Sequence, residues 1–140
     1  MIAYFDTSAV VPLLVAEQGS SAAHAAWNAA TRVASVRLVY PESRAALAQA
    51  HRSRRITTRQ LRRAVDVLEL ICAQLDVVEV DDDLAHHAGE LAEAHGLRGY
   101  DAVHLAAADR MRDAELVMVA GDRALLDATQ RLGIDTAAVG

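Results

Sequence analysis

Apolar residues in this chain form short β-prone runs that alternate with longer helical patterns. Compact apolar runs predict strands, and each is followed by a segment rich in alanine and leucine or with apolar residues at helical spacing. This alternation is typical of a parallel sheet with helices on both faces. We therefore expect a three-layer α/β/α fold, with strands near residues 1–5, 32–36, 77–80, 116–119 and 134–137.

The longest helical pattern begins at Thr57 or Thr58, either of which can cap the start of a helix. Its apolar residues step by four and three along one face, which indicates that this face is buried: Leu61, Val65, Leu68, Cys72 and Leu75. Further helices are expected over residues 9–17 and 20–31, from the Pro41-Glu42 pair onward, from residues 81–83 to His95, from Gly99 onward and after Asp122.

Length and composition predict one ordinary folded domain over residues 1–140. The chain is 53% hydrophobic and 24% charged and has two prolines and seven glycines, which excludes a disordered or low-complexity protein. The single cysteine, Cys72, makes no internal disulfide, and no charged-then-apolar leader opens the sequence. No apolar stretch approaches the ~20 residues of a membrane-spanning helix. We expect a cytoplasmic protein with no membrane segment.

The net charge of −5 excludes a globally basic nucleic-acid binder, but the charge is unevenly distributed. Residues 1–63 carry a net charge of +6 and residues 64–140 a net charge of −11. Between Glu42 and Asp66 there is no acid and there are seven arginines. Such a segment is a solvated helical face, a contact for the RNA backbone or a landing site for an acidic partner. The candidates for RNA contact are Arg52, Arg54, Arg55 and Arg59.

Four acidic residues stand at expected helix starts: Asp6, Glu42, Asp101 and Asp122. Taken singly, each is explained as a helix cap. In a doubly wound sheet, however, the helix starts that follow the strands lie at one edge, where such folds bind ligands. Two carboxylates ~4 Å apart repel by about 4 kcal/mol at an effective dielectric constant of ~20, so converging acids need a cation. Mg²⁺ and Mn²⁺ prefer such oxygen ligands and promote phosphodiester hydrolysis, which points to a nuclease.

Three segments resemble the motifs of a known family. They are Ile-Ala-Tyr-Phe-Asp-Thr-Ser-Ala at residues 2–9, Leu-Arg-Gly-Tyr-Asp-Ala-Val-His-Leu-Ala at residues 97–106 and Val-Ala-Gly-Asp-Arg at residues 119–123. Their order and the chain length resemble the PIN-domain ribonucleases, in particular the VapC toxins of bacterial toxin–antitoxin pairs. The resemblance covers essentially the whole chain, and the segment around Asp101 is its most specific part.

This resemblance implies an endoribonuclease that depends on Mg²⁺ or Mn²⁺ and leaves 5′-phosphate and 3′-hydroxyl ends. Asp6 and Asp101 match the acids that hold the metal most directly. Glu42 and Asp122 match the second and fourth acids, which complete the pocket directly or through waters. The family also implies a homodimer and a cognate VapB-like antitoxin, whose C-terminal segment enters the acidic pocket.

Around these acids the resemblance implies supporting side chains. Thr7 and Ser8 would orient Asp6 by hydrogen bonds. Many relatives carry Thr or Ser two residues before the fourth acid, where this chain has Ala120. His104 lies three residues after Asp101, and we expect it in core packing or a local hydrogen bond rather than as a general base.

The alternative from another class is a catalytically silent module with the PIN fold. Such a protein would bind RNA or a partner and would use the four acids only as helix caps. The chain has no phosphate-binding Gly-Lys-Ser/Thr loop and no paired-cysteine zinc spacing. A phosphatase is disfavoured because Ser8 stands where the second aspartate of that chemistry would be.

Overall fold

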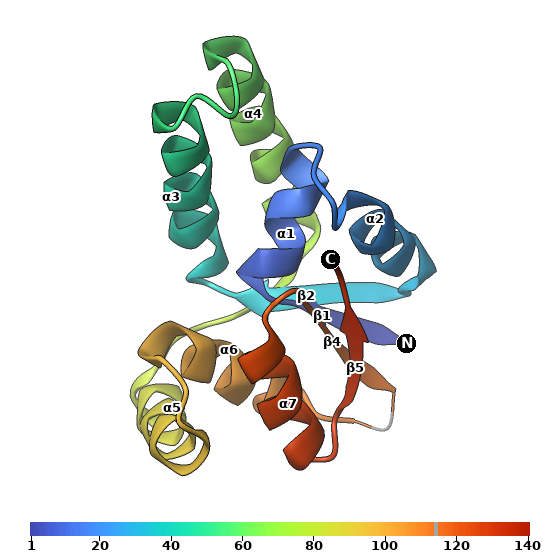
Figure 1. The fold of residues 1–140 in the computed structure, drawn as a ribbon. Helices are drawn as coiled ribbons and strands as arrows, with labels where there is room; N and C mark the ends of the chain where they lie inside the picture. The colour runs from blue at the N-terminus through green and yellow to red at the C-terminus, as the bar shows by residue number, and fades with distance from the viewer. Residues whose placement is uncertain (114) are drawn as a thin grey trace.

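A parallel sheet forms the centre of the protein (Figure 1). The computed structural model describes residues 1–113 and 115–140. Within them the sheet has five strands in the order β3-β2-β1-β4-β5, each paired in parallel with its neighbours. The strands are β1 Ile2–Phe5, β2 Arg32–Val36, β3 Asp76–Val78, β4 Leu116–Ala120 and β5 Asp135–Ala138.

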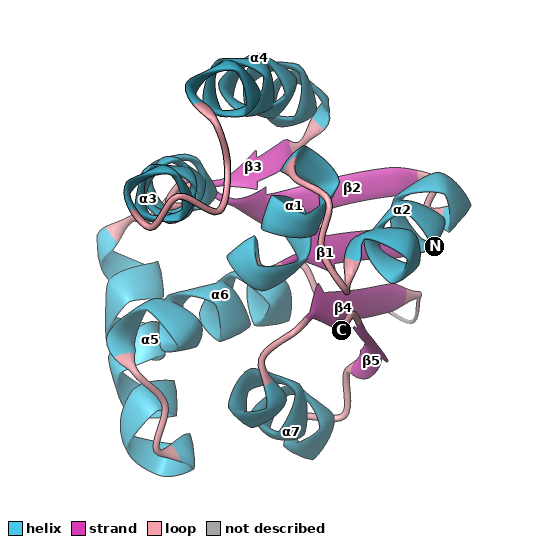
Figure 2. Cartoon of the chain, turned by 45° about the horizontal axis from the view of Figure 1, so that its top comes forward, coloured by secondary structure: helices cyan, strands magenta, loops and turns pink. Residues whose placement is uncertain are grey.

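Helices cover both faces of the sheet, so the predicted three-layer α/β/α arrangement is confirmed (Figure 2). One face carries α1 Thr7–Leu14, α2 Ser20–Ala29, α3 Val39–Arg52 and α4 Thr58–Gln74. The other face carries α5 Asp82–His95, α6 Gly99–Arg110 and α7 Arg123–Arg131.

Alternation along β1 divides the core into two clusters, because successive side chains of a strand point to opposite faces. Tyr4 belongs to the cluster beneath α5, α6 and α7, whereas Ala3 and Phe5 belong to the cluster beneath α1, α2 and α4. Phe5 packs edge-on against Trp27 of α2, with ring centroids 5.4 Å apart. The single run Ala3-Tyr4-Phe5 therefore anchors both helical layers.

The strand order reverses at the pair β1 and β4. From β1 the chain moves outward to β2 and β3, and it later returns to the other side of β1 with β4 and β5. A crevice outside the carboxyl ends of the strands at such a switch point is where doubly wound sheets bind ligands. Phe5 pairs with Val119, and the Asp6 N–H donates to the Val119 carbonyl at 3.0 Å, so the turns after β1 and β4 lie side by side.

Some element boundaries differ from those expected. The helix predicted over residues 9–17 starts at Thr7 and ends at Leu14. Asp6 caps it as expected, but the helix begins two residues earlier than predicted. Pro12 inside it provides no N–H to the helical ladder, in keeping with its short length. The helix expected from Pro41 begins at Val39, which moves Glu42 from the helix cap into its first turn. Among the described residues, no helix combines the length and apolar character needed to cross a membrane.

Candidate active site

Helix starts at the carboxyl edge of the sheet carry all four predicted acids. Asp6 is the N-cap of α1, where Oδ2 accepts the Ser8 N–H at 3.1 Å, and Asp122 is the N-cap of α7, where Oδ1 accepts the Leu125 N–H at 3.0 Å. Glu42 and Asp101 lie in the first turns of α3 and α6. The capping explanation therefore holds for two of the four acids and leaves the other two for a different role.

His104 links two of these acids from a buried position. Its side chain is 1% exposed, and Nε2 lies 2.7 Å from Oε1 of Glu42 and 3.3 Å from Oδ1 of Asp6. On the other side of the ring, Nδ1 lies 2.9 Å from the buried hydroxyl of Tyr4. The expectation of a buried, hydrogen-bonded histidine is met, but the partners come from β1 and α3 rather than from nearby residues. The sequence did not predict these contacts. The available signal was the spacing of three residues between Asp101 and His104, which places His104 near the acids on the same helix.

The hydrogen bonds of His104 determine which ring nitrogen carries a proton. An ionised carboxylate only accepts hydrogen bonds, so Nε2 must donate to Glu42. Burial on its own lowers the pKa of His104, but the hydrogen bond to Glu42 and the charges of Asp6, Glu42 and Asp101 outweigh burial and raise the pKa above its ordinary value. The imidazole thus stabilises the negative charge of the acids around it.

Ser8 ties the two central turns together. Its hydroxyl donates to Oδ2 of Asp6 and accepts the N–H of Gly121 at 2.8 Å, which joins the end of β1 to the end of β4. The hydrogen bond predicted from Ser8 to Asp6 is present. A side chain at Gly121 would not fit easily, since an added Cβ would lie 3.0 Å from the Val139 carbonyl oxygen.

Thr7 differs from its prediction. Its hydroxyl donates to Oε1 of Glu42 at 2.9 Å, and among the described residues it makes no hydrogen bond to Asp6. The reason is its place as the first residue of α1, facing the start of α3, whereas Ser8 faces β4. Ala120 carries no hydroxyl, and Asp122 is instead oriented by its own bond to the Leu125 N–H.

Arg98 spans the remaining two acids. Its Nε lies 3.3 Å from Oδ2 of Asp101 and its Nη2 lies 3.5 Å from Oδ2 of Asp122. Burial raises the pKa of Asp101, and the charges of Asp122 and Asp6 raise it further, while Arg98 lowers it. Asp6, Asp101 and Asp122 are therefore close enough to repel one another, and the cluster favours a cation.

The donor set fits a hard divalent cation. Within the described residues, Oε2 of Glu42 and Oδ1 of Asp101 accept no hydrogen bond, and Oδ2 of Asp122 faces only Arg98. Carboxylate oxygens of this kind suit Mg²⁺ or Mn²⁺. In the part of the chain that is described, no three of the acids and histidines already surround one point at coordinating distance. To hold a cation at one point, these side chains would have to rotate.

The predicted RNA-binding arginines gather away from the acids. Arg52 ends α3, Arg54 and Arg55 lie in the following turn, and Arg59 lies in the first turn of α4 (Figure 1). Along α3, Arg52 lies ten residues after Glu42, a rise of about 15 Å. Within residues 1–113 and 115–140, none of the four arginines pairs with a carboxylate. Their charge is thus free for an anionic partner.

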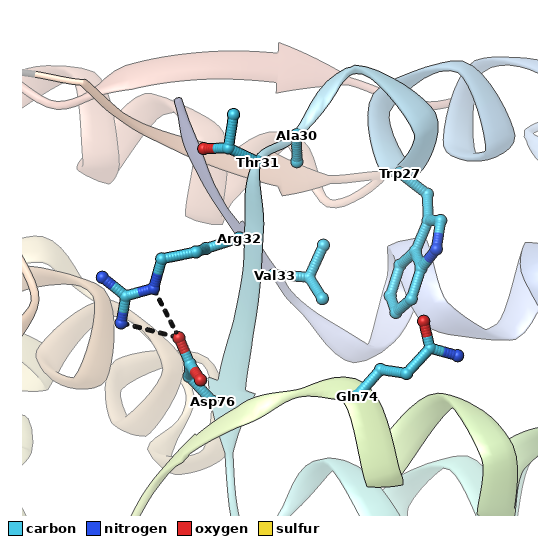
Figure 3. A pocket seen from close by; sticks show the side chains of 7 residues that line it. All are labelled: Trp27, Ala30, Thr31, Arg32, Val33, Gln74 and Asp76. Atoms are coloured by element: carbon cyan, nitrogen blue, oxygen red, sulfur yellow. Dashed lines mark hydrogen bonds and ion pairs between the residues drawn. The ribbon is translucent and has the colours of Figure 1, made fainter.

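A separate cavity lies at the opposite edge of the sheet (Figure 3). It has a volume of about 350 Å³, and Trp27, Arg32, Gln74 and Asp76 help to line it. Its one carboxylate, Asp76, is paired with Arg32 at 2.7 Å. This cavity therefore lacks the uncommitted acids found at the carboxyl edge.

Comparison with known proteins places these features in a family. A PIN domain model matches residues 3–130. Ribonuclease VapC49 of Mycobacterium tuberculosis is 47% identical over 124 residues, which cover 89% of this chain and 86% of the relative. Among solved structures, FitAcB from Neisseria gonorrhoeae has a TM-score of 0.71 at 16% identity, covering 97% of this chain and 96% of that one. VapBC-5 of Mycobacterium tuberculosis, a member of the VapBC family of toxin–antitoxin systems, has a TM-score of 0.64 at 20% identity, covering 99% and 98%. The two structural likenesses show the fold.

Proposed function

Because this chain belongs to the PIN-domain family and resembles a VapC ribonuclease over most of its length, we propose that it is a metal-dependent endoribonuclease of a toxin–antitoxin pair. The observation that carries this proposal is the meeting of four acids from four separate helix starts at the switch point of the sheet. His104 contacts two of these acids and Arg98 contacts the other two. Acids that served only as caps of their own helices would not need such shared partners.

In this proposal Asp6 and Asp101 hold Mg²⁺ or Mn²⁺, and Glu42 and Asp122 complete the pocket directly or through water. When bound, the cation supplies the positive charge that activates a water molecule and stabilises the charge growing on the phosphate. The surrounding side chains act on the acids. Ser8 orients Asp6, while Thr7 and His104 orient Glu42 and leave its second oxygen available.

The substrate and partners follow from the same family membership. We propose that RNA is cleaved at the acids and that its backbone extends to Arg52, Arg54, Arg55 and Arg59. A cognate VapB-like antitoxin would silence the enzyme, in line with the solved toxin–antitoxin relative. We propose that the whole chain acts as one domain and assembles as a homodimer, with Tyr100, 65% exposed at the start of α6, among the apolar groups available for contact.

Asp101→Asn tests the proposed chemistry. The substitution keeps the size of the side chain and removes the charge that holds the cation. Mutation of a residue that only supports a metal ligand lowers activity by up to about 100-fold, so loss of a ligand itself should lower Mn²⁺-dependent RNA cleavage by at least that factor. The matched control is Asp127→Asn on α7, whose carboxylate pairs with Arg123 at 3.9 Å outside the cluster. Cleavage that is unchanged in Asp101→Asn would contradict the nuclease proposal and favour the catalytically silent module.

A second experiment tests the RNA path. The variant with Arg54, Arg55 and Arg59 replaced by alanine should bind RNA with a weaker salt dependence, because each lost phosphate contact lowers the slope of log K against log salt by about 0.7 for single-stranded RNA. Loss of three contacts predicts a decrease of about 2 in that slope. An equal triple replacement of Arg110, Arg112 and Arg123, which all pair with carboxylates, should leave the slope nearly unchanged. A slope unaffected by the first variant would exclude this path.

A further inference from the structure

Arg98 occupies an unusual position for an arginine. It is the N-cap of α6 and makes no side-chain capping bond there, although Ser, Thr, Asp and Asn are favoured at such a position. A cation at a helix N-terminus also opposes the helix dipole. Neither effect favours arginine at this position, so any role of Arg98 lies in the contacts of its guanidinium.

The guanidinium bridges two acids on different helices. It reaches from the start of α6 to Asp101 on the same helix and to Asp122 at the start of α7, at 3.3 and 3.5 Å. The side chain of Arg98 is 81% exposed, whereas those of Asp101 and Asp122 are 16% and 26% exposed. Arg98 therefore lies over the solvent side of the acid cluster, held by long and exposed contacts that break easily.

The bridge uses the oxygen of Asp122 that the helix cap leaves free. Oδ1 of Asp122 is engaged by the Leu125 N–H, which leaves Oδ2 as the oxygen free for other ligands, and Oδ2 is the atom that Arg98 contacts. A divalent cation that binds Oδ2 of Asp122 must therefore compete with Arg98. Once displaced, a guanidinium at this place is well suited to a phosphate, whose oxygens it binds with two parallel hydrogen bonds.

We propose that Arg98 is a substrate-binding residue with two alternative partners, a role that rests on the proposed nuclease function. Without a divalent cation it pairs with Asp101 and Asp122. The cation displaces it, and the released guanidinium then binds a phosphate of the RNA beside the acids. Entry of the metal and binding of the RNA are in this way coupled through one exposed side chain.

Nearby Arg123 provides a matched control. It follows Asp122 directly, is 73% exposed, and pairs with Asp127 at 3.9 Å rather than with the cluster. Removal of either arginine changes the net charge near the acids equally, but only Arg98 contacts them. Arg98→Gln and Arg123→Gln therefore separate direct competition from a general effect of charge.

Cation binding is the first measurement. In calorimetric titrations of the full chain with Mn²⁺, Arg98→Gln should bind about two- to fivefold more tightly than wild type, the range expected when an exposed ion pair no longer competes. Arg123→Gln should bind Mn²⁺ as wild type does. An Mn²⁺ dissociation constant that is the same in Arg98→Gln as in wild type, or is lowered equally by Arg123→Gln, would overturn the competition.

RNA binding is the second measurement. In EDTA, where Arg98 is engaged by the acids, fluorescence anisotropy should give nearly equal RNA dissociation constants for wild type and Arg98→Gln. With Mn²⁺, single-turnover cleavage should show the half-saturating RNA concentration raised about tenfold in Arg98→Gln and partly restored in Arg98→Lys. Equal half-saturation with Mn²⁺ would overturn the phosphate contact. Absence of cleavage from wild type would instead overturn the nuclease function, while the Mn²⁺ titration would still decide the competition.

Discussion

Replacing Tyr4 with phenylalanine removes a single hydroxyl from the support of the acid cluster. Tyr4 is fully buried, its hydroxyl lies 2.9 Å from Nδ1 of His104, and its ring meets the imidazole edge-on with centroids 5.8 Å apart. Phenylalanine retains that ring packing. The substitution therefore isolates the hydrogen bond that holds the far side of His104.

The expected cost follows from leaving a buried nitrogen without a partner. Nδ1 of His104 would lose its hydrogen bond in a place that water does not reach, a loss of about 1–3 kcal/mol. With an unfolding entropy of ~2.1 cal/mol/K per residue, the chain's 140 residues give ~0.3 kcal/mol/K. The melting temperature should thus fall by about 3–10 °C.

Scanning calorimetry between pH 6 and pH 9 measures this effect. Burial, and next the charge of Asp6, raise the pKa of Tyr4 well above its ordinary value, so the phenol stays protonated and its hydroxyl remains available to His104 over this range. Tyr40→Phe is the control, since its hydroxyl bonds to Glu69 and Arg44 at the surface and its loss should change the melting temperature little. If Tyr4→Phe melted within about 1 °C of wild type, the hydrogen bond to His104 would carry no net stability and the reasoning would be refuted.

Three further predictions concern the cap of α4, an acid outside the cluster and the cation. Thr57→Ala removes the capping box formed with Gln60 and should lower the free energy of unfolding by about 1 kcal/mol, as measured by urea denaturation. The hydrogen bond from Arg110 lowers the pKa of Asp81 to about 2. The ion pair between these two residues therefore contributes fully to stability above the ordinary carboxyl pKa, and its contribution is lost as the pH falls toward 2. Arg110→Ala should raise the Asp81 pKa in an NMR titration. Mn²⁺ at ~100 times its dissociation constant should stabilise the fold by about 2.7 kcal/mol, and EDTA or Asp101→Asn should abolish this gain in calorimetry.

Local signals predicted most of the fold. Capping residue types marked the helix starts at Asp6, Thr57, Asp81 and Asp122, and each of these side chains accepts a backbone N–H as such residues do. Because parallel strands place their carboxyl ends at one edge, the same signals also predicted that the acids would meet there. Boundaries were less certain, as at Val39, where no side chain caps the helix and the start lies two residues before Pro41.

Contacts between side chains from distant segments were not predictable in this way. Thr7 and Ser8 are neighbours in sequence, yet one faces Glu42 on α3 and the other faces Asp6 and Gly121. The direction of each side chain depends on where the first turn of α1 sits relative to α3 and β4, which no local pattern specifies. The bond from His104 to Glu42 likewise joins residues 62 positions apart and arises only when α3 and α6 pack at the same edge.

The two nitrogen donors that contact the acid cluster, His104 and Arg98, differ in how firmly they are held, and this difference decides which one a cation can replace. His104 is buried and makes contacts through both ring nitrogens, so its movement would leave Tyr4, Asp6 and Glu42 without this partner. Arg98 is exposed and makes only two long contacts, so its release costs little. The acid cluster is thus stabilised by a fixed donor on the inside, at Asp6 and Glu42, and a displaceable one on the outside, at Asp101 and Asp122. A divalent cation would enter from the side of Arg98, which also makes that guanidinium available to RNA.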